Sequence, residues 1–195
     1  MAARILIMDS STEEKMMIKH KRIITYLLSL LPIFMLLAFT AGANAATKEY
    51  RFKAAFLIQF VKYTQWPKIN GDQIVVGIIG DDSFGDALDK YQDKNVQGKN
   101  LVFINIDDIN EAKTCCQLLF ISVSEKDRID GIINALAGKP ILTVSEIDDF
   151  TQKGGMIYLV RKGTKQKFMV SVKNADKGSL KFSPHMLKVA SSVDK

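Results

Sequence analysis

The sequence predicts an α/β fold with three layers: a mostly parallel sheet, helices on both of its faces, and an antiparallel hairpin at its C-terminal edge. Short runs rich in β-branched residues, such as Gln73–Ile79 and Leu118–Val123, alternate with segments of helical spacing, as in βαβ units. These runs are apolar at nearly every position, which is typical of strands buried on both faces. Near the C-terminus, Gly163 and Thr164 separate two further strand-like runs, which predicts a hairpin.

The first element of the folded domain is expected to be a helix from Tyr50 to Trp66, which Pro67 ends by restricting the residue before it. Its apolar stripe covers much of the circumference, so it should contact more than one neighbour. Burial in the core is the favoured interpretation, and a partner surface is the alternative.

The central part of the chain follows a turn at residues 70–72. Strands are expected at Gln73–Ile79, Leu101–Ile106, Leu118–Val123 and Ile141–Val144. Helices are expected at Ser83–Tyr91 and Ser124–Ala137, with a helical turn that reaches Phe150 after the fourth strand.

The C-terminal part is expected to contain the antiparallel pair Met156–Val160 and Lys167–Val172, with Gly154 and Gly155 leading into its first strand. The sequence Ser183-Pro184 then opens a short helix that reaches Ala190, because proline is well tolerated at the first helical position.

The N-terminal segment has the organisation of a secretory signal peptide. A basic stretch at residues 19–22 precedes an apolar run at residues 23–41 and the small-residue motif Ala43-Asn44-Ala45. We therefore expect residues 1–45 to be removed after Ala45, which leaves 46–195 as a single exported domain. The acidic residues among the first fifteen suit no signal peptide, so translation is expected to start at Met16 or Met17.

An uncleaved membrane anchor is the alternative interpretation of this segment, since about 20 apolar residues can span a bilayer. Pro32 in the middle of the run and the well-formed cleavage motif favour removal.

Charge and cysteine content exclude several classes of function. The formal net charge is +6, but after the expected signal peptide the only dense basic run is Arg161, Lys162, Lys165 and Lys167. Such a run is typical of a solvated hairpin turn, so no nucleic-acid partner is expected. Cys115 and Cys116 are adjacent and cannot join distant parts of the fold. Two buried thiols are the favoured interpretation. A strained, redox-active bond between these neighbours and a bridge between molecules are the alternatives.

No set of residues points to catalysis, a metal or a cofactor, so we do not expect an enzyme. His185 is the only histidine after the signal peptide and has no sequence relation to a nucleophile. A small-molecule site is the alternative function: Asp82, Ser83, Thr143 and Ser145 follow or belong to strands whose carboxyl ends could form a ligand crevice.

Several segments, in order, resemble the YfiR family (DUF4154) of periplasmic regulators. The resemblance begins with Tyr50-Arg51-Phe52-Lys53-Ala54-Ala55-Phe56-Leu57 and reaches Trp66-Pro67. It continues through Gly80-Asp81-Asp82-Ser83-Phe84-Gly85, Cys116-Gln117-Leu118-Leu119-Phe120-Ile121-Ser122, Leu142-Thr143-Val144-Ser145-Glu146, Phe168-Met169-Val170-Ser171-Val172 and Leu187-Lys188-Val189-Ala190.

This resemblance implies a periplasmic protein that holds an inner-membrane diguanylate cyclase inactive by engaging its periplasmic sensor region, and so lowers cyclic-di-GMP and biofilm formation. The expected partner surface lies on the segment Phe168–Ala175 and the C-terminal helix, with Phe168, Val170, Val172, Ala175 and Met186 as its residues. Packing of these side chains on the sheet is the alternative, and a second copy of the chain remains open as a partner.

The sequence departs from the family pattern in three respects. Met169, Val170 and Ser171 stand where the family usually has an acidic residue followed by Ile-Asn, and Pro184 replaces a usual serine. Cys116 matches the family's cysteine, but the distant cysteines that form disulfides in some members are absent. Both a redox staple and a partner contact through the acidic residue are therefore in doubt for this chain.

Cleavage after Ala45 is directly testable. Intact-mass analysis of the protein isolated from the cell envelope should show a chain that begins at Ala46, because the small residues of the motif fit the peptidase. A species that retains residues 23–41 would show that the segment is an anchor.

Overall fold

A computed structural model describes residues 48–81, 84–163 and 165–195. The expected signal peptide, Asp82, Ser83 and Thr164 lie outside these residues. An N-terminal helix at residues 48–63 comes first. It is followed by β1 (Thr64–Gln65), β2 (Gln73–Ile79), η1 (Gly85–Ala87), η2 (Asp89–Tyr91), β3 (Asn95–Val96), β4 (Lys99–Ile106), α2 (Ile109–Cys115), β5 (Leu118–Ile121), η3 (Val123–Glu125), α3 (Ile129–Leu136), β6 (Leu142–Ser145), β7 (Ile157–Lys162), β8 (Lys165–Ser171), α4 (Val172–Lys177), β9 (Lys181–Phe182), α5 (Pro184–Val189) and β10 (Ser192–Asp194).

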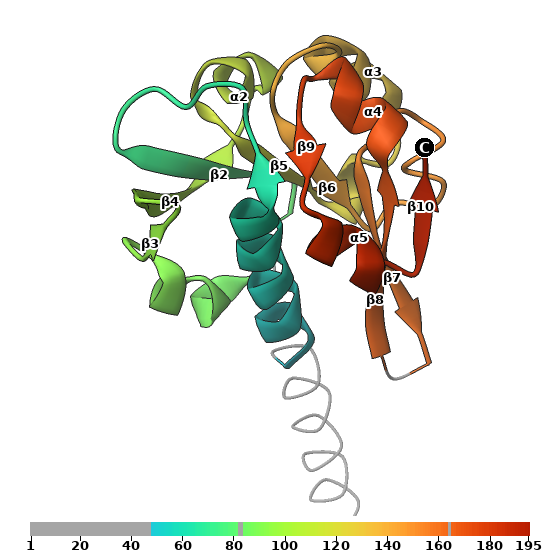
Figure 1. Ribbon diagram of the computed structural model, residues 1–195, viewed down its shortest axis with the longest axis horizontal. Coiled ribbons are helices and arrows are strands. Elements are labelled where there is room, and N and C mark those ends of the chain that lie inside the picture. Colours follow the sequence, from blue (N-terminus) through green and yellow to red (C-terminus); the bar gives the residue numbers. More distant parts are fainter. Residues whose placement is uncertain (1–47, 82–83, 164) are drawn as a thin grey trace, which may run out of the picture. The chain divides into compact units, whose positions relative to one another are not determined.

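The main sheet has the strand order β10-β8-β7-β6-β5-β2-β4-β3 (Figure 1). Strands β4, β2, β5, β6 and β7 run parallel, whereas β3 and β8 pair antiparallel with β4 and β7. The predicted α/β class, with a mostly parallel sheet and an antiparallel hairpin, is therefore confirmed. Beside this hairpin, the short strand β10 pairs parallel with β8 and places Val193 opposite Val170.

The two faces of this sheet bury separate apolar clusters, which gives the three expected layers. Along β2, Ile74, Val76 and Ile78 face the cluster that also contains Leu57, Phe60 and Val61 of the N-terminal helix. Ile79 belongs to the other cluster, together with Ala112 of α2 and Ile132 of α3. The part of the chain from Thr47 to Lys195 forms one compact unit. In Figure 1 the N-terminal helix and α5 cross one face of the sheet, and α2 and α3 lie toward the other.

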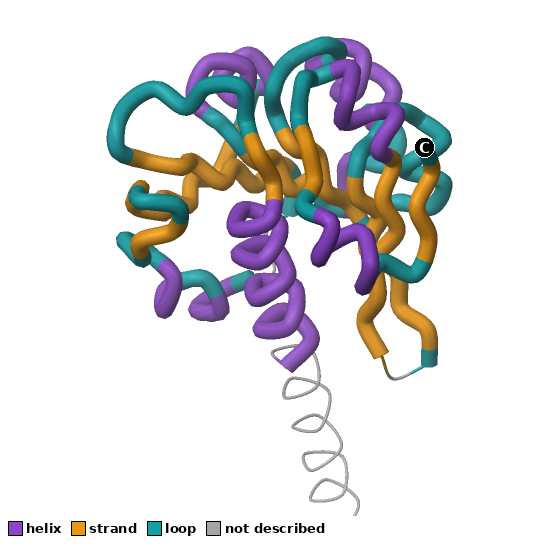
Figure 2. Tube along the Cα trace, viewed as in Figure 1, coloured by secondary structure: helices purple, strands orange, loops and turns teal. Residues whose placement is uncertain are grey.

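The N-terminal helix is fixed at its C-terminal end by a residue far along the chain. Gln97 and Gly98, both with positive φ, make the two-residue turn between β3 and β4. From this turn the Gln97 side-chain amide donates to the carbonyls of Val61, Lys62 and Thr64, at 3.0, 3.0 and 2.9 Å. These acceptors would otherwise lack partners at a helix end, so Gln97 acts as a C-terminal cap. Figure 2 shows that β1 follows directly where the helix stops.

Several helices differ from the sequence-based expectation, and local hydrogen bonds explain two of them. The unpredicted α2 is capped at its N-terminus by Asp108, whose carboxylate accepts from the Asn110 amide. The strand expected to reach Val172 ends at Ser171, because the Ser171 hydroxyl caps the unpredicted helix α4. The helix expected at Ser124–Ala137 is divided into η3 and α3, and the described part of the one expected at Ser83–Tyr91 forms η1 and η2.

The two cysteines are free thiols at the junction of α2 and β5. Cys116 is buried and Cys115 is half-buried, with 3.4 Å between the two sulfur atoms. Cys116 packs over Gly77 of β2, where an added Cβ would lie 2.6 Å from its Sγ. Burial, followed by the nearby Cys115 thiol, raises the pKa of Cys116 and keeps it protonated. Of the two thiols expected to be buried, Cys116 is a small buried hydrophobe, whereas Cys115 is only half-buried.

Stability should not depend on a disulfide, because a bond between neighbouring residues closes no loop that could restrict the unfolded chain. We expect the variant Cys115→Ala/Cys116→Ala to lose about 0.5–3 kcal/mol of unfolding free energy through lost packing. Reductant should leave the melting temperature of the wild-type protein unchanged in a calorimetric scan. Unfolding by reductant alone would contradict this expectation.

Candidate partner-binding surface

One face of the N-terminal helix contacts the C-terminal third of the chain. Its residues are spaced by four and three positions, which places them on one line along the helix. From the start of the helix to its end, this line consists of Glu49, Lys53, Phe56, Phe60 and Tyr63. Its first two members form ion pairs and its last three form aromatic contacts. The helix is therefore divided along its length into a charged part and an apolar part.

The charged part is organised around the Lys53 ammonium, whose side chain is only 4% exposed. Its Nζ lies 2.8 Å from a Glu49 oxygen and 2.7 Å from a Glu146 oxygen, just beyond the end of β6. The Tyr50 ring lies beneath the ammonium, 4.1 Å from Nζ to the ring centre. Arg161 of β7 donates to the second Glu49 oxygen at 2.7 Å. These contacts join the helix to two strands, so Arg161 is not solely part of a solvated hairpin as the sequence suggested.

The electrostatics of this cluster stabilise its charged form. Burial by itself would lower the pKa of Lys53, but the bonds from Glu146 and Glu49 outweigh it and raise the pKa. The bond from Lys53 lowers the pKa of Glu49, with a further contribution from the charge of Arg161, against a smaller opposing effect of burial. Both shifts favour the charged forms of Lys53 and Glu49, so their ion pair serves as a fixed attachment of the helix.

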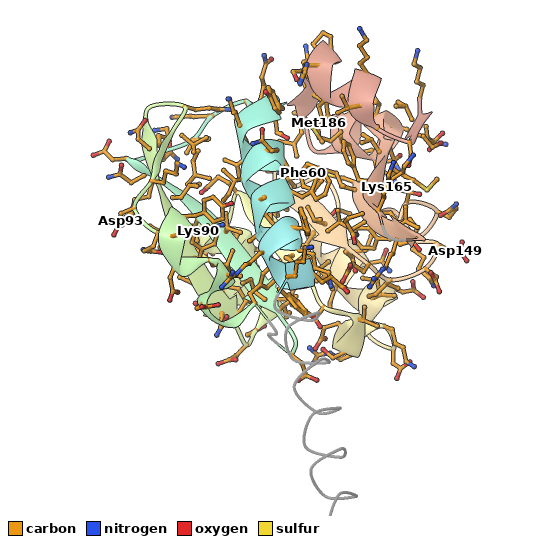
Figure 3. All side chains as sticks on the ribbon, turned by 90° about the horizontal axis from the view of Figure 1, so that it is seen from below. Phe60, Lys90, Asp93, Asp149, Lys165 and Met186 are labelled. Atoms are coloured by element: carbon orange, nitrogen blue, oxygen red, sulfur yellow. The ribbon has the colours of Figure 1, made fainter. Side chains whose placement is uncertain are left out.

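The apolar part of the helix borders a groove of about 140 Å³ between the N-terminal helix and α5. Phe168 of β8 meets Phe60 and Phe56 edge-to-face, with ring centres 5.1 and 5.7 Å apart. In Figure 3, Phe60 and Met186 lie at the seam between the helix and the C-terminal elements. The residues that line the groove are Phe56, Gln59, Phe60, Tyr63, Phe168, His185, Met186 and Val189.

Part of this groove is open to solvent although most of its lining residues are apolar or aromatic. Val189 at the end of α5 is 59% exposed, and Phe52, one helical turn before Phe56, is 55% exposed. Together with the half-buried Phe56 and Tyr63, they offer aromatic and aliphatic surface beside a fixed floor. Such a combination suits a protein partner, because the binding energy of interfaces concentrates on a few large apolar residues.

The structure brings together only some of the partner-binding residues expected from the sequence. Phe168 and Met186 lie in the floor of the groove, whereas Val170 and Ala175 are buried in the core. Met186 is the buried residue of α5 and is only 2% exposed, so its side chain packs inward instead of offering open surface to a partner. Val172 is half-buried at the first position of α4 and remains a candidate contact.

The groove residues contributed by the N-terminal helix were missing from that expected site. Phe56, Gln59 and Tyr63 belong to the wide stripe that was assigned mainly to the core. The signal for them was present in the sequence, since a stripe this wide indicates more than one neighbour.

Thr143 and Ser145, where a ligand crevice was expected, are both buried, although Thr143 also lines a cavity between α3 and α4. Thr143 Oγ1 accepts from the Met156 amide at 3.1 Å. Ser145 Oγ donates to the Ile121 carbonyl at 2.7 Å and accepts from the Ile147 amide at 3.1 Å. Both hydroxyl groups therefore serve the fold.

Two further findings concern the described residues alone. They contain no group of three or more His, Cys, Asp or Glu side chains arranged to hold a metal ion. None of their helices combines the length and the hydropathy that crossing a bilayer requires.

A groove with a buried floor and the exposed apolar Val189 at its rim is a surface of the kind found in the class of protein-binding modules. Comparison with known families specifies this class further: the chain belongs to the YfiR/HmsC-like family (DUF4154), which matches residues 50–191. The family is regulatory and periplasmic.

Other comparisons add little to this assignment. No curated protein matches the sequence significantly. A conserved domain protein from Vibrio cholerae covers 62% of this chain with 9% identity and a TM-score of 0.44. An ABC domain from Streptococcus pneumoniae, solved in complex with L-Trp, covers 62% with 13% identity and a TM-score of 0.44. The chain spans about half of these proteins, 54% and 55% of their lengths.

The Lys53 cluster predicts a large effect of one substitution. Lys53→Met should lower the free energy of unfolding by about 3–5 kcal/mol, because it leaves Glu146 without its cation in a partly buried position. The exposed Lys62 on the same helix provides the control, and Lys62→Met should change stability by less than about 0.5 kcal/mol. Urea titration measures both values, and equal effects of the two variants would refute the assignment.

The cluster also predicts how stability depends on pH. Because the pKa of Glu49 is lowered on folding, its contribution is present above the ordinary value of 4.5 and is lost as the pH falls through the folded value. Because the pKa of Lys53 is raised, its contribution is present below 10.5 and is lost only at higher pH. Glu49→Gln should therefore lose less stability than the wild-type protein when acidified from neutral pH, as measured by urea titrations across that range.

Proposed function

We propose that the protein is a periplasmic repressor that binds the periplasmic sensor region of an inner-membrane diguanylate cyclase and holds the enzyme inactive. Repression lowers cyclic-di-GMP and, through it, biofilm formation. Membership of the YfiR/HmsC-like family is the observation that carries this proposal. The exposed apolar groove supports it, because a regulator that acts by binding needs a surface of this kind.

The proposed mechanism is a shift of population between two states of the cyclase. A binding protein shifts such an equilibrium only by the difference between its affinities for the two states. Moving a cyclase from almost fully active to almost fully inactive requires about 5.5 kcal/mol of preferential binding. A few apolar residues in a well-packed contact supply energies of this size in protein interfaces.

The sensor region is proposed to dock along the groove between the N-terminal helix and α5. The exposed side chains of Val189 and Gln59 lie at its rim, while Phe168 and Met186 form a rigid floor that needs no ordering on binding. Val172, on the neighbouring helix α4, extends the same proposal to the segment expected from the sequence.

Deletion of the gene should raise cellular cyclic-di-GMP, measured by mass spectrometry, and should increase biofilm. The variant Val189→Asp should reproduce the deletion, because a carboxylate at the groove removes apolar contact and must be desolvated on binding. Since Val189 is exposed, the variant should fold and be exported normally.

Val123→Asp is the matched control, because Val123 is 49% exposed but lies in η3, outside the groove. It should leave cyclic-di-GMP at the wild-type level. Unchanged cyclic-di-GMP in the deletion strain, with the cyclase expressed, would contradict the repressor function. Equal effects of the two variants would contradict the groove as its site.

A further inference from the structure

A second and larger hollow lies where the parallel strands begin, between α3, α4 and the turn at residues 151–154. Its volume is about 530 Å³, within the range of about 300–1,000 Å³ that small-molecule sites occupy. Leu136, Thr143 and Met156 are buried residues of its lining, and Ile133 contributes a further apolar side chain. None of the aromatic residues of the groove described above lines this cavity.

The walls of this cavity are held by hydrogen bonds and close packing. The buried side-chain amide of Asn174 in α4 donates to the carbonyls of Thr151 and Gly155, both at 2.8 Å, and so ties the turn to the helix. Gly154 has a φ of +101°, and a Cβ there would lie 2.8 Å from the Ile133 side chain. The turn therefore rests directly against α3, and the cavity exists without a ligand.

The charged groups of the lining are predominantly cationic. Lys153 comes from the turn, and Lys173 and Lys177 come from α4. Lys177 Nζ is positioned by the Asn174 side-chain oxygen, 3.3 Å away. Asp194 is the acidic member of the lining, and its carboxylate accepts a hydrogen bond from the Ser171 hydroxyl at 3.2 Å.

The lysines retain donors for a ligand. Lys153 has a loose ion pair, 3.6 Å from Asp130, on the exposed surface. Among the described residues, Lys173 makes no ion pair within 4.0 Å. Each ammonium group offers three donors, so the bonds to Asn174 and Asp130 leave several unused. Cations gathered at the mouth of a concave, partly apolar site raise the local concentration of anions.

We propose that this cavity binds a small organic anion that carries a phosphate or two carboxylates on a short aliphatic body. The anionic oxygens are bound by the ammonium groups of Lys173 and Lys177, with Lys153 of the turn as a further cation of the lining. The aliphatic body packs against Leu136 and Met156. This inference does not depend on the proposed repressor function, because it concerns a separate cavity and requires no partner protein.

Calorimetric titration of the protein purified from the cell envelope tests the proposal, with glycerol 3-phosphate and succinate as probes for the two kinds of anion. At least one probe should give saturable binding, and the probe that binds identifies the recognised group. Lys173→Gln/Lys177→Gln should weaken this binding at least tenfold, since the variant removes two charge-assisted contacts. Lys181→Gln/Lys188→Gln removes the same charge from exposed residues outside the cavity and should weaken it less than twofold.

Three results would overturn the proposal. The first is the absence of saturable binding by both probes to the wild-type protein. The second is an equal loss of affinity in the two double variants, which would show a general attraction of anions to a basic protein. The third is sulfate binding as strong as that of the better probe, which would show that the aliphatic body makes no contact. Circular dichroism of all variants verifies that they are folded.

Discussion

The Lys53 ammonium is almost completely removed from water, and two carboxylates replace its hydration. A buried charge without such partners would cost several kcal/mol, so the position of the N-terminal helix is restricted to one in which Glu146 reaches Lys53. Glu146 follows β6, and Glu49 also binds Arg161 of β7. The cluster thereby fixes the start of the helix over the carboxyl ends of two strands, and Gln97 fixes its end.

The groove is a consequence of this placement. With both ends of the helix fixed, Phe56 and Phe60 are held over Phe168 of β8. The helix α5 then packs beside them through Met186, which leaves Val189 at the rim. The strand β10 also covers β8, and Ser191 contributes two hydrogen bonds to the Phe168 carbonyl. A partner therefore meets a rigid side-chain surface here, and the edge of β8 from Met169 to Ser171 is already paired.

The fold class and the central strands were predictable because their signals are local. The run Gln73–Ile79 reads as a strand from its own composition, and it is β2 in the structure with the same bounds. The short elements β3, β10 and α4 were not predicted, since pairing and capping by residues elsewhere define two- to six-residue segments. Gln97 illustrates the limit: nothing in its neighbourhood indicates that it caps a helix more than thirty residues earlier.

For the candidate surfaces too, the sequence indicated single residues but not the contacts between distant segments. The sequence identified Phe168 and Met186 as residues of interest, and both lie in the groove, but it did not reveal which of them solvent reaches. Burial depends on the neighbours that the fold supplies, and these come from the N-terminal helix and α5. The Lys53 cluster and the lysine-lined cavity were invisible for the same reason, because each combines residues from several distant segments.

The central claim is that the groove contacts the sensor region of a membrane-bound cyclase. Site-specific photo-crosslinking in living cells tests it most directly, with a photoreactive residue in place of Gln59 at the rim of the groove. The same residue in place of Asp130, exposed on α3, provides the reference. The account predicts that Gln59, and not Asp130, yields an adduct with a membrane protein that carries a diguanylate cyclase domain. Adducts from Asp130 alone, or none with such a protein from Gln59, would contradict it.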